Sequence, residues 1–138
     1  MGLLENEKNI KKIFENTPAD QFYDKLIQLG KELPPYPTEF RLDENRVVGC
    51  QSLMFCHISL ANEKITILIE SEALISKGIA ALVVALFSGL TAKEVFEKKV
   101  EVFESIGLVT SLSLTRLNGL QSLLNYFYKK TLNLLNSN

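Results

Sequence analysis

Apolar residues recur three and four positions apart over the first 30 residues, a spacing that predicts two amphipathic helices. The first helix is expected over 5–16. The second is expected to begin with Thr17 as its N-cap and Pro18 at its first helical position, and to end at Gly30. The apolar faces are Ile10, Ile13 and Phe14 in the first helix, and Phe22, Leu26 and Leu29 in the second.

The next segment changes from helical to β-type patterning. Three prolines between positions 34 and 37 remove backbone donors, so 33–45 is expected to be irregular. Apolar and β-branched residues then predict two strands, over 53–60 and 65–69, joined by a short loop at 61–63. A short edge strand at 46–48 is expected to precede them.

The chain then returns to helical spacing. Ser71 is expected to cap a helix over 72–88 that ends at Gly89. The second half of this helix is apolar nearly all round, which is typical of a central helix packed on a sheet. Thr91 and Glu94 have the spacing of a capping box, in which each side chain binds the backbone N–H of the other residue.

The remaining elements complete an α+β pattern. A short helix follows the capping box, another is expected around 102–106, and Ser113 or Thr115 caps the last helix. The apolar stripe of that helix is Leu117, Leu120, Leu124, Phe127 and Leu132. The order of elements predicts a small antiparallel sheet, about three-stranded, flanked by helices. At this length, 1–138 is predicted to be a single domain that needs no metal or disulfide to fold.

Composition narrows the classes of function. With 15 basic and 16 acidic residues the net charge is -1, and no basic stripe indicates a nucleic-acid partner. The longest apolar run, 79–87, is far shorter than the roughly 20 residues that span a bilayer, so no membrane partner is expected. Two cysteines and no recognisable signal peptide predict a reducing, cytoplasmic location.

The main chemical candidate is Cys50, which lies beside Gly49 between the proline-rich segment and the first predicted strand. A thiol on a turn can be reached by a partner, and glycine gives the backbone freedom to present it. Cysteine acts as a nucleophile only as the thiolate, which forms near positive charge or a helix N-terminus. The spacing alone leaves two interpretations of Cys50 open, a nucleophile or a loop cysteine without a chemical role.

The other metal-ligating residue types are interpreted as structural. Cys56 lies within an apolar strand and is expected in the core. A disulfide with Cys50 is rejected, because the extended segment between them spans about 20 Å and bridged Cα atoms lie within about 7 Å. His57, the only histidine, is expected on the opposite face of the strand. No metal site is predicted, because these residues lack a fourth ligand.

Three charged residues remain as candidates. Glu70 and Glu72 lie at a strand–helix junction, where the preference of helix N-termini for acidic residues explains Glu72. Arg116 opposes the same preference near the start of the last helix. A surface ion pair would explain Arg116, and the alternative is a contact with a substrate, a sulfur anion or a partner protein.

Several short motifs follow one another along the chain. They are Val48-Gly49-Cys50-Gln51-Ser52, Glu70-Ser71-Glu72, Ile75-Ser76-Lys77-Gly78-Ile79, Gly89-Leu90-Thr91, Gly107-Leu108 and Arg116-Leu117-Asn118-Gly119-Leu120. With these motifs in this order, and a Leu-Gly-x-x-Leu-Pro run within 26–34, the chain resembles the SufE-like sulfur-acceptor family. Members of that family are partners of cysteine desulfurases in iron–sulfur cluster assembly.

The resemblance implies a role for the loop cysteine. In the family this cysteine, here Cys50, attacks the persulfide of a desulfurase and carries the terminal sulfur to a scaffold complex of the SufBCD kind. The residues expected to frame the loop or touch the partner are Gly49, Gln51, Ser52, Glu72 and Arg116. The pyridoxal phosphate belongs to the desulfurase, so this chain is expected to bind no cofactor of its own. It is expected to be a monomeric sulfur-transfer partner rather than a stand-alone enzyme.

Two alternatives to the sulfur acceptor stay open. The chain could be an adaptor that docks a desulfurase without carrying sulfur. It could also be a thiol redox protein in which Cys50 reacts and Cys56 resolves, although the spacing of these residues argues against that. Replacing Cys50 separates the sulfur acceptor from the adaptor, because only the acceptor depends on the thiol.

Overall fold

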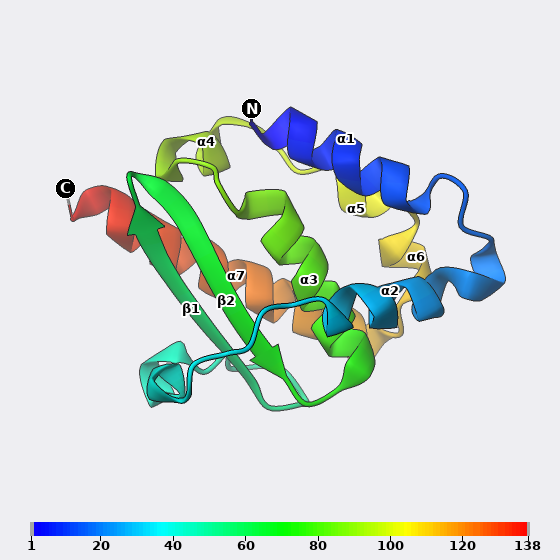
Figure 1. Cartoon of the computed structure of the whole chain (residues 1–138), viewed down its shortest axis with the longest axis horizontal. Coiled ribbons are helices and arrows are strands. Elements are labelled where there is room, and N and C mark those ends of the chain that lie inside the picture. Colours follow the sequence, from blue (N-terminus) through cyan, green and yellow to red (C-terminus); the bar gives the residue numbers. More distant parts are fainter. Residues whose placement is uncertain (1, 138) are drawn as a thin grey trace.

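A computed structural model describes residues 2–137 and has mixed helices and sheet, which confirms the α+β class. Figure 1 shows a two-stranded hairpin along one side of a group of helices. The α-helices are α1 (Leu3–Phe14), α2 (Phe22–Lys31), α3 (Leu74–Phe87), α4 (Ala92–Glu97), α5 (Val102–Ser105), α6 (Leu108–Ser111) and α7 (Leu114–Asn136). The 3₁₀ turns are η1 (Ala19–Gln21), η2 (Thr38–Phe40) and η3 (Asp43–Asn45). No described helix is long and apolar enough to cross a membrane.

The sheet consists of β1 (Met54–Ala61) and β2 (Lys64–Ser71), which pair antiparallel. The two residues of the connecting turn, Asn62 and Glu63, have φ angles of 53° and 67°, as a tight hairpin with the right-handed twist of the strands requires. The predicted edge strand at 46–48 is reduced to one bridge, between Arg46 and Phe55. The chain bends at Gly49, whose φ is +101°, directly after this bridge, so a longer ladder does not form.

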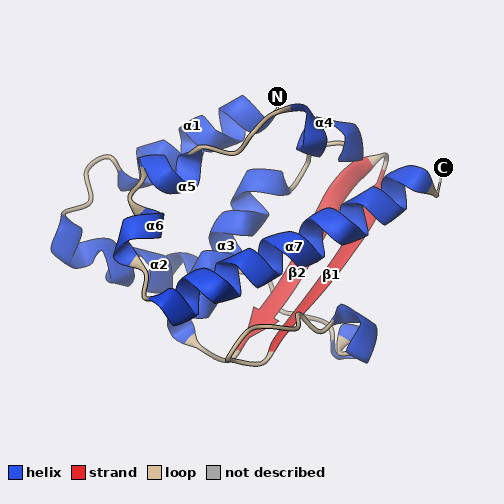
Figure 2. Ribbon diagram, turned by 180° about the vertical axis from the view of Figure 1, so that it is seen from behind, coloured by secondary structure: helices blue, strands red, loops and turns tan. Residues whose placement is uncertain are grey.

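Helix α3 is the central element, as its apolar sequence predicts. It packs against β2 on one side and against α1, α2 and α7 on others (Figures 1 and 2). Its buried Phe87 stacks on Phe127 of α7 at a ring-centroid distance of 4.2 Å. The expected cap at Ser71 is wrong, because Ser71 still pairs with Met54 in the sheet, and α3 begins only after Ala73.

Helices α2 and α3 approach each other closely at two glycines. A Cβ on Gly30 would lie 2.8 Å from the backbone nitrogen of Gly78, and one on Gly78 would lie 2.2 Å from the carbonyl oxygen of Leu26. α2 ends at Lys31, one residue beyond the predicted end, but Gly30 does not have the left-handed backbone of a C-terminal stop. The glycine lies inside α2 because this crossing leaves no room for a side chain.

The predicted start of the second helix is also wrong. The Thr17 hydroxyl donates to the carbonyl of Ile13 at the end of α1 instead of capping α2. Pro18 is extended and precedes η1, so α2 begins only at Phe22. A threonine near a helix C-terminus can satisfy a preceding carbonyl, and here that local bond replaces the N-cap.

The N-caps of the two helices α4 and α7, in the second half of the chain, are formed as the sequence predicts. The Thr91–Glu94 capping box is formed at the start of α4, and the Ser113 side chain caps α7 by accepting from the backbone N–H of Arg116. The α7 stripe is wrong at Leu132, which is 46% exposed, whereas Thr131 is buried. Thr131 continues the four-residue step from Phe127, and Leu132 lies one position beyond it.

Candidate functional site

The Cys50 turn depends on the backbone of Gly49. Gly49 has a φ of +101°, a conformation that residues with a side chain rarely adopt. A Cβ at this position would lie 2.4 Å from the Oγ of Ser122 on α7. Glycine is therefore required both for the bend and for the close approach of the turn to α7.

Cys50 itself is half-buried against the same helix. Its Sγ donates to the carbonyl oxygen of Gly119 at 3.7 Å, and the sulfur would lie 4.0 Å from a Cβ on Gly119. Burial raises the pKa of the Cys50 thiol above its ordinary value, and among residues 2–137 no charged group lowers that pKa. The thiol is thus held protonated and sheltered in this conformation.

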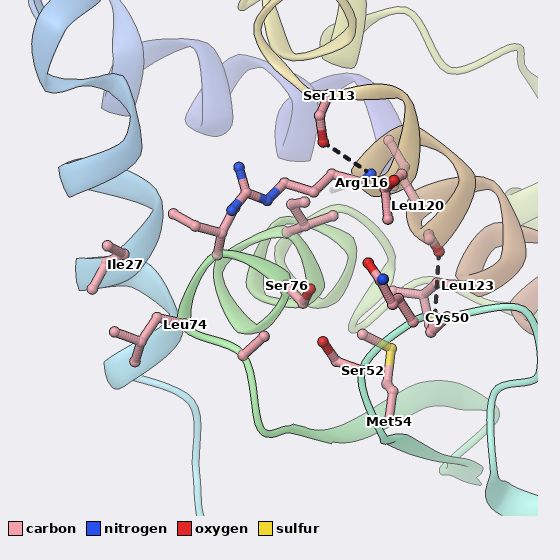
Figure 3. A pocket seen from close by; sticks show the side chains of 16 residues that line it. Ile27, Cys50, Ser52, Met54, Leu74, Ser76, Ser113, Arg116, Leu120 and Leu123 are labelled. Atoms are coloured by element: carbon pink, nitrogen blue, oxygen red, sulfur yellow. Dashed lines mark hydrogen bonds between the residues drawn. The ribbon is translucent and has the colours of Figure 1, made fainter.

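The thiol lies on the wall of a pocket of about 630 Å³ between the Cys50 turn, the start of α3 and the start of α7 (Figure 3). The apolar lining residues are Ile27, Met54, Ala73, Leu74, Ile75, Ile79, Leu120 and Leu123. The polar lining residues are Gln51, Ser52, Ser76, Ser113, Thr115 and Arg116. Hydroxyl and amide groups therefore border an apolar pocket beside the thiol, and Arg116 is its only charged lining residue within the described chain.

Arg116 contributes the positive charge of the pocket but does not direct it at the sulfur. In Figure 3 its guanidinium extends away from Cys50. The guanidinium carbon lies over the ring of Tyr23 in α2, 5.6 Å from the ring centroid, which is a cation–π contact. Within residues 2–137 no carboxylate lies within ion-pair distance of Arg116, so the expected surface ion pair is not found.

The structure brings most of the predicted site residues together. Cys50, Gln51, Ser52 and Arg116 all line the pocket, and Gly49 shapes the turn beside it. Glu72 is exposed at the junction between β2 and α3 and does not line the pocket. Its neighbour Glu70 forms a bidentate ion pair with Arg41, which explains that carboxylate structurally.

The second cysteine and the histidine lie elsewhere. Cys56 is 1% exposed inside the hairpin core, and burial raises its pKa to about 12. The thiol therefore stays protonated and unreactive, which is typical of a structural cysteine. His57 stacks on Phe40 at a centroid distance of 3.8 Å on the other face of β1. Cys50 and Cys56 are both free thiols. Within the described residues, no group of three His, Cys, Asp or Glu side chains could hold a metal ion.

Three residues around the site were not identified as contacts from the sequence. Gly119 accepts the thiol hydrogen bond, Ser122 limits the turn, and Tyr23 holds Arg116. Gly119 carried a signal, because an isolated glycine inside a leucine-rich helix usually has a packing or functional reason. Ser122 and Tyr23 carried none, since both occupy ordinary helical positions.

The whole site lies within a region of known family similarity. Residues 8–131 match the family described as SufE, Fe-S metabolism associated domain. The sulfur acceptor protein CsdE of Escherichia coli is 32% identical over 111 residues, which are 77% of this chain and 76% of that protein. The cysteine desulfuration protein SufE of Wigglesworthia glossinidia brevipalpis is 30% identical over 112 residues, 80% of this chain and 78% of that protein.

A solved structure has the same fold. The solution structure of a hypothetical protein from Thermus thermophilus superposes with a TM-score of 0.79, covering 95% of this chain and 96% of that one. At 22% sequence identity this likeness concerns the fold alone. The likeness in fold extends over nearly the whole chain.

Proposed function

This chain belongs to the SufE family, and we propose from that membership that it is a sulfur acceptor for a cysteine desulfurase in iron–sulfur metabolism. The observation that carries the proposal is Cys50, a thiol on a glycine-dependent turn at the wall of a sheltered pocket. The relatives named for sulfur acceptance and for cysteine desulfuration support the same role. We assign Cys50 as the residue that receives the sulfur.

The proposed step is a sulfur exchange without net oxidation. The Cys50 thiol loses its proton, and the thiolate attacks the terminal sulfur of a persulfide on the desulfurase cysteine. A bond forms between Cys50 Sγ and that sulfur while the sulfur–sulfur bond of the desulfurase breaks. The desulfurase cysteine leaves as a thiolate and takes up the proton. Cys50 then carries the persulfide.

The pocket suits a residue that must be protected between two partners. A persulfide is consumed by any thiolate that reaches it. The apolar wall beside Cys50 therefore reduces the rate at which small thiols in solution remove the carried sulfur. The same burial raises the thiol pKa and slows attack. The resting turn therefore favours protection, and docking of the desulfurase must draw the turn outward for transfer.

The surface around the pocket supports a docking role. Val48, Leu74 and Leu114 are 84%, 55% and 74% exposed, and each belongs to one of the three segments that form the pocket. Exposed apolar side chains that cluster in one region are typical of an interaction surface, whereas single scattered ones are not. We propose this rim as the contact with the desulfurase, which supplies the pyridoxal phosphate, and later with a scaffold of the SufBCD kind.

The decisive experiment measures intact mass after incubation with a cysteine desulfurase and L-cysteine. Wild type is expected to gain sulfur that a reductant removes, Cys50→Ala to gain none, and the matched control Cys56→Ala to gain as much as wild type. Sulfur gained by Cys50→Ala would refute the assignment. Stimulation of the desulfurase that survives Cys50→Ala, with no sulfur on the wild type, would favour the adaptor.

The thiol redox alternative needs a disulfide between Cys50 and Cys56. One thiol lies at the pocket and the other is enclosed in the hairpin core, so a bridge would require part of β1 to leave the sheet. Mild peroxide followed by peptide mass mapping tests this alternative directly. A Cys50–Cys56 linked peptide in folded protein would revive it.

A further inference from the structure

The Tyr23–Arg116 contact at the mouth of the pocket is not explained by packing alone. Arg116 lies in the first turn of α7, where the helix dipole disfavours positive charge. Within 2–137 it has no carboxylate partner, and its guanidinium rests on the ring of Tyr23. A charge in an unfavourable place, held by an aromatic ring beside a reactive thiol, calls for a functional reason.

The ring that holds Arg116 is itself fixed. The Tyr23 hydroxyl donates to the carbonyl of Ser111, at the end of α6 and just before α7. The ring also meets Phe22 edge-on at a centroid distance of 6.0 Å. The Tyr23 ring is therefore held from two sides where it faces the guanidinium, and its contacts join α2 to the start of α7.

Arg116 lies on the same stretch of α7 as the carbonyl that holds the Cys50 sulfur, and both residues line the pocket. Arg116 and Gly119 are three residues apart on one face of α7, about 5–6 Å between Cβ positions. The Cys50 sulfur would lie 4.0 Å from a Cβ on Gly119, on the same face. A guanidinium released from Tyr23 would therefore share the pocket with the sulfur while the backbone of α7 stays in place.

We propose that Tyr23 is a positioning residue that holds Arg116 away from Cys50 in the resting protein, and that release of Arg116 from the Tyr23 ring supplies the positive charge for thiolate formation. The proposal rests on the sulfur-acceptor function and concerns its regulation. Arg116 is the only ionisable residue that shares the pocket lining with Cys50 among those described. Docking of a partner over Tyr23 or the pocket mouth would be the event that releases it.

The test measures the apparent pKa of Cys50 in the isolated protein, from the pH profile of alkylation by iodoacetamide, with the Cys50 peptide followed by mass spectrometry. Tyr23→Leu removes the ring and is expected to raise the alkylation rate below the thiol pKa about two- to fivefold, the population shift expected from losing one exposed cation–π contact. Tyr23→Phe keeps the ring and loses only the hydroxyl bond to Ser111, so its profile should lie closer to that of wild type than to that of Tyr23→Leu. The alkaline plateau, which reports access to the sulfur, should be the same in all three proteins.

The dependence on Arg116 decides the matter. In an Arg116→Gln background, Tyr23→Leu should have no effect on the profile. An unchanged profile for Tyr23→Leu, or an acceleration that persists in Arg116→Gln, would overturn the proposal. If Tyr23→Leu does not fold, Tyr23→Gln takes the same test, since it removes the ring with a good helix former at this partly exposed position. No desulfurase is present, so the result is independent of whether Cys50 accepts sulfur.

Discussion

Replacing Gly49 by alanine should displace the Cys50 turn from its pocket. The residue has a φ of +101°, and forcing alanine into such a conformation costs about 1–3 kcal/mol. The new Cβ would also lie 2.4 Å from the Oγ and 3.1 Å from the Cβ of Ser122. The Ser122 hydroxyl can rotate away, but its Cβ belongs to α7 and cannot.

The contact that opposes this strain is weak. The thiol of Cys50 makes one hydrogen bond, at 3.7 Å, to the carbonyl of Gly119. A strain of about 1–3 kcal/mol therefore raises the population of the open turn about 5- to 150-fold, without unfolding the domain. The free energy of unfolding should fall by no more than the same about 1–3 kcal/mol.

Alkylation by iodoacetamide at mildly alkaline pH measures the opening. Cys50 in Gly49→Ala should react at least about fivefold faster than in wild type, while the buried Cys56 stays unreactive and serves as an internal reference. Ser122→Ala added to Gly49→Ala removes the hydroxyl contact but keeps the backbone strain, so it should restore only part of the wild-type rate. A wild-type rate and wild-type stability for Gly49→Ala would show that the turn is not held as described.

Three further predictions concern the core and the thiols. Cys56→Ala should lower the free energy of unfolding in urea by about 1 kcal/mol through a small cavity, and a loss of sulfur acceptance by the folded variant would contradict the structural role of Cys56. Gly78→Ala should lower the free energy of unfolding by about 3 kcal/mol, because its Cβ would meet the Leu26 carbonyl at 2.2 Å. Gly119→Ala, at a helical glycine with room for a Cβ, should raise the free energy of unfolding by about 0.5–1 kcal/mol. Equal effects of the two substitutions in thermal unfolding would refute the helix crossing. Both thiols have raised pKa values in the folded chain, so the unfolded chain loses its thiol protons first as the pH rises. The free energy of unfolding should therefore fall above the ordinary thiol pKa of 9.0. Urea titrations at several pH values should find this fall smaller in Cys56→Ala.

The sequence predicted the elements better than their ends. Helical and strand periodicity located α1, α3, α7 and the hairpin, because burial of one face repeats along each of them. Gly30 was misread because a glycine that ends a helix and one that allows two helices to cross have the same local signal. The crossing depends on Gly78, which lies far away in the chain, so only the tertiary structure distinguishes the two cases.

The candidate site shows the same division. Cys50 and Gly49 were identifiable from adjacent residues, because a thiol beside a glycine is a local pattern. The contacts of Cys50 with Gly119 and of Arg116 with Tyr23 join segments remote in sequence, and helical spacing cannot show which helices face each other. Glu72 matched a family motif, yet it lies outside the pocket, since the chain turns between β2 and α3 there.

The glycine crossing of α2 and α3 also gives the pocket one stiff wall and one removable wall. Ile27 and Leu74 line one side of the pocket and lie about one turn before Gly30 and Gly78. The direct backbone contact of α2 with α3 at these glycines keeps that side of the pocket in place. The opposite side is the short turn around Cys50, whose Sγ donates one long hydrogen bond, at 3.7 Å, to the carbonyl of Gly119. The pocket should therefore open in one direction only. Hydrogen exchange on partner binding should change around 48–53 and leave the interior of α3 as it was, and loss of protection in α3 would contradict this mechanical asymmetry.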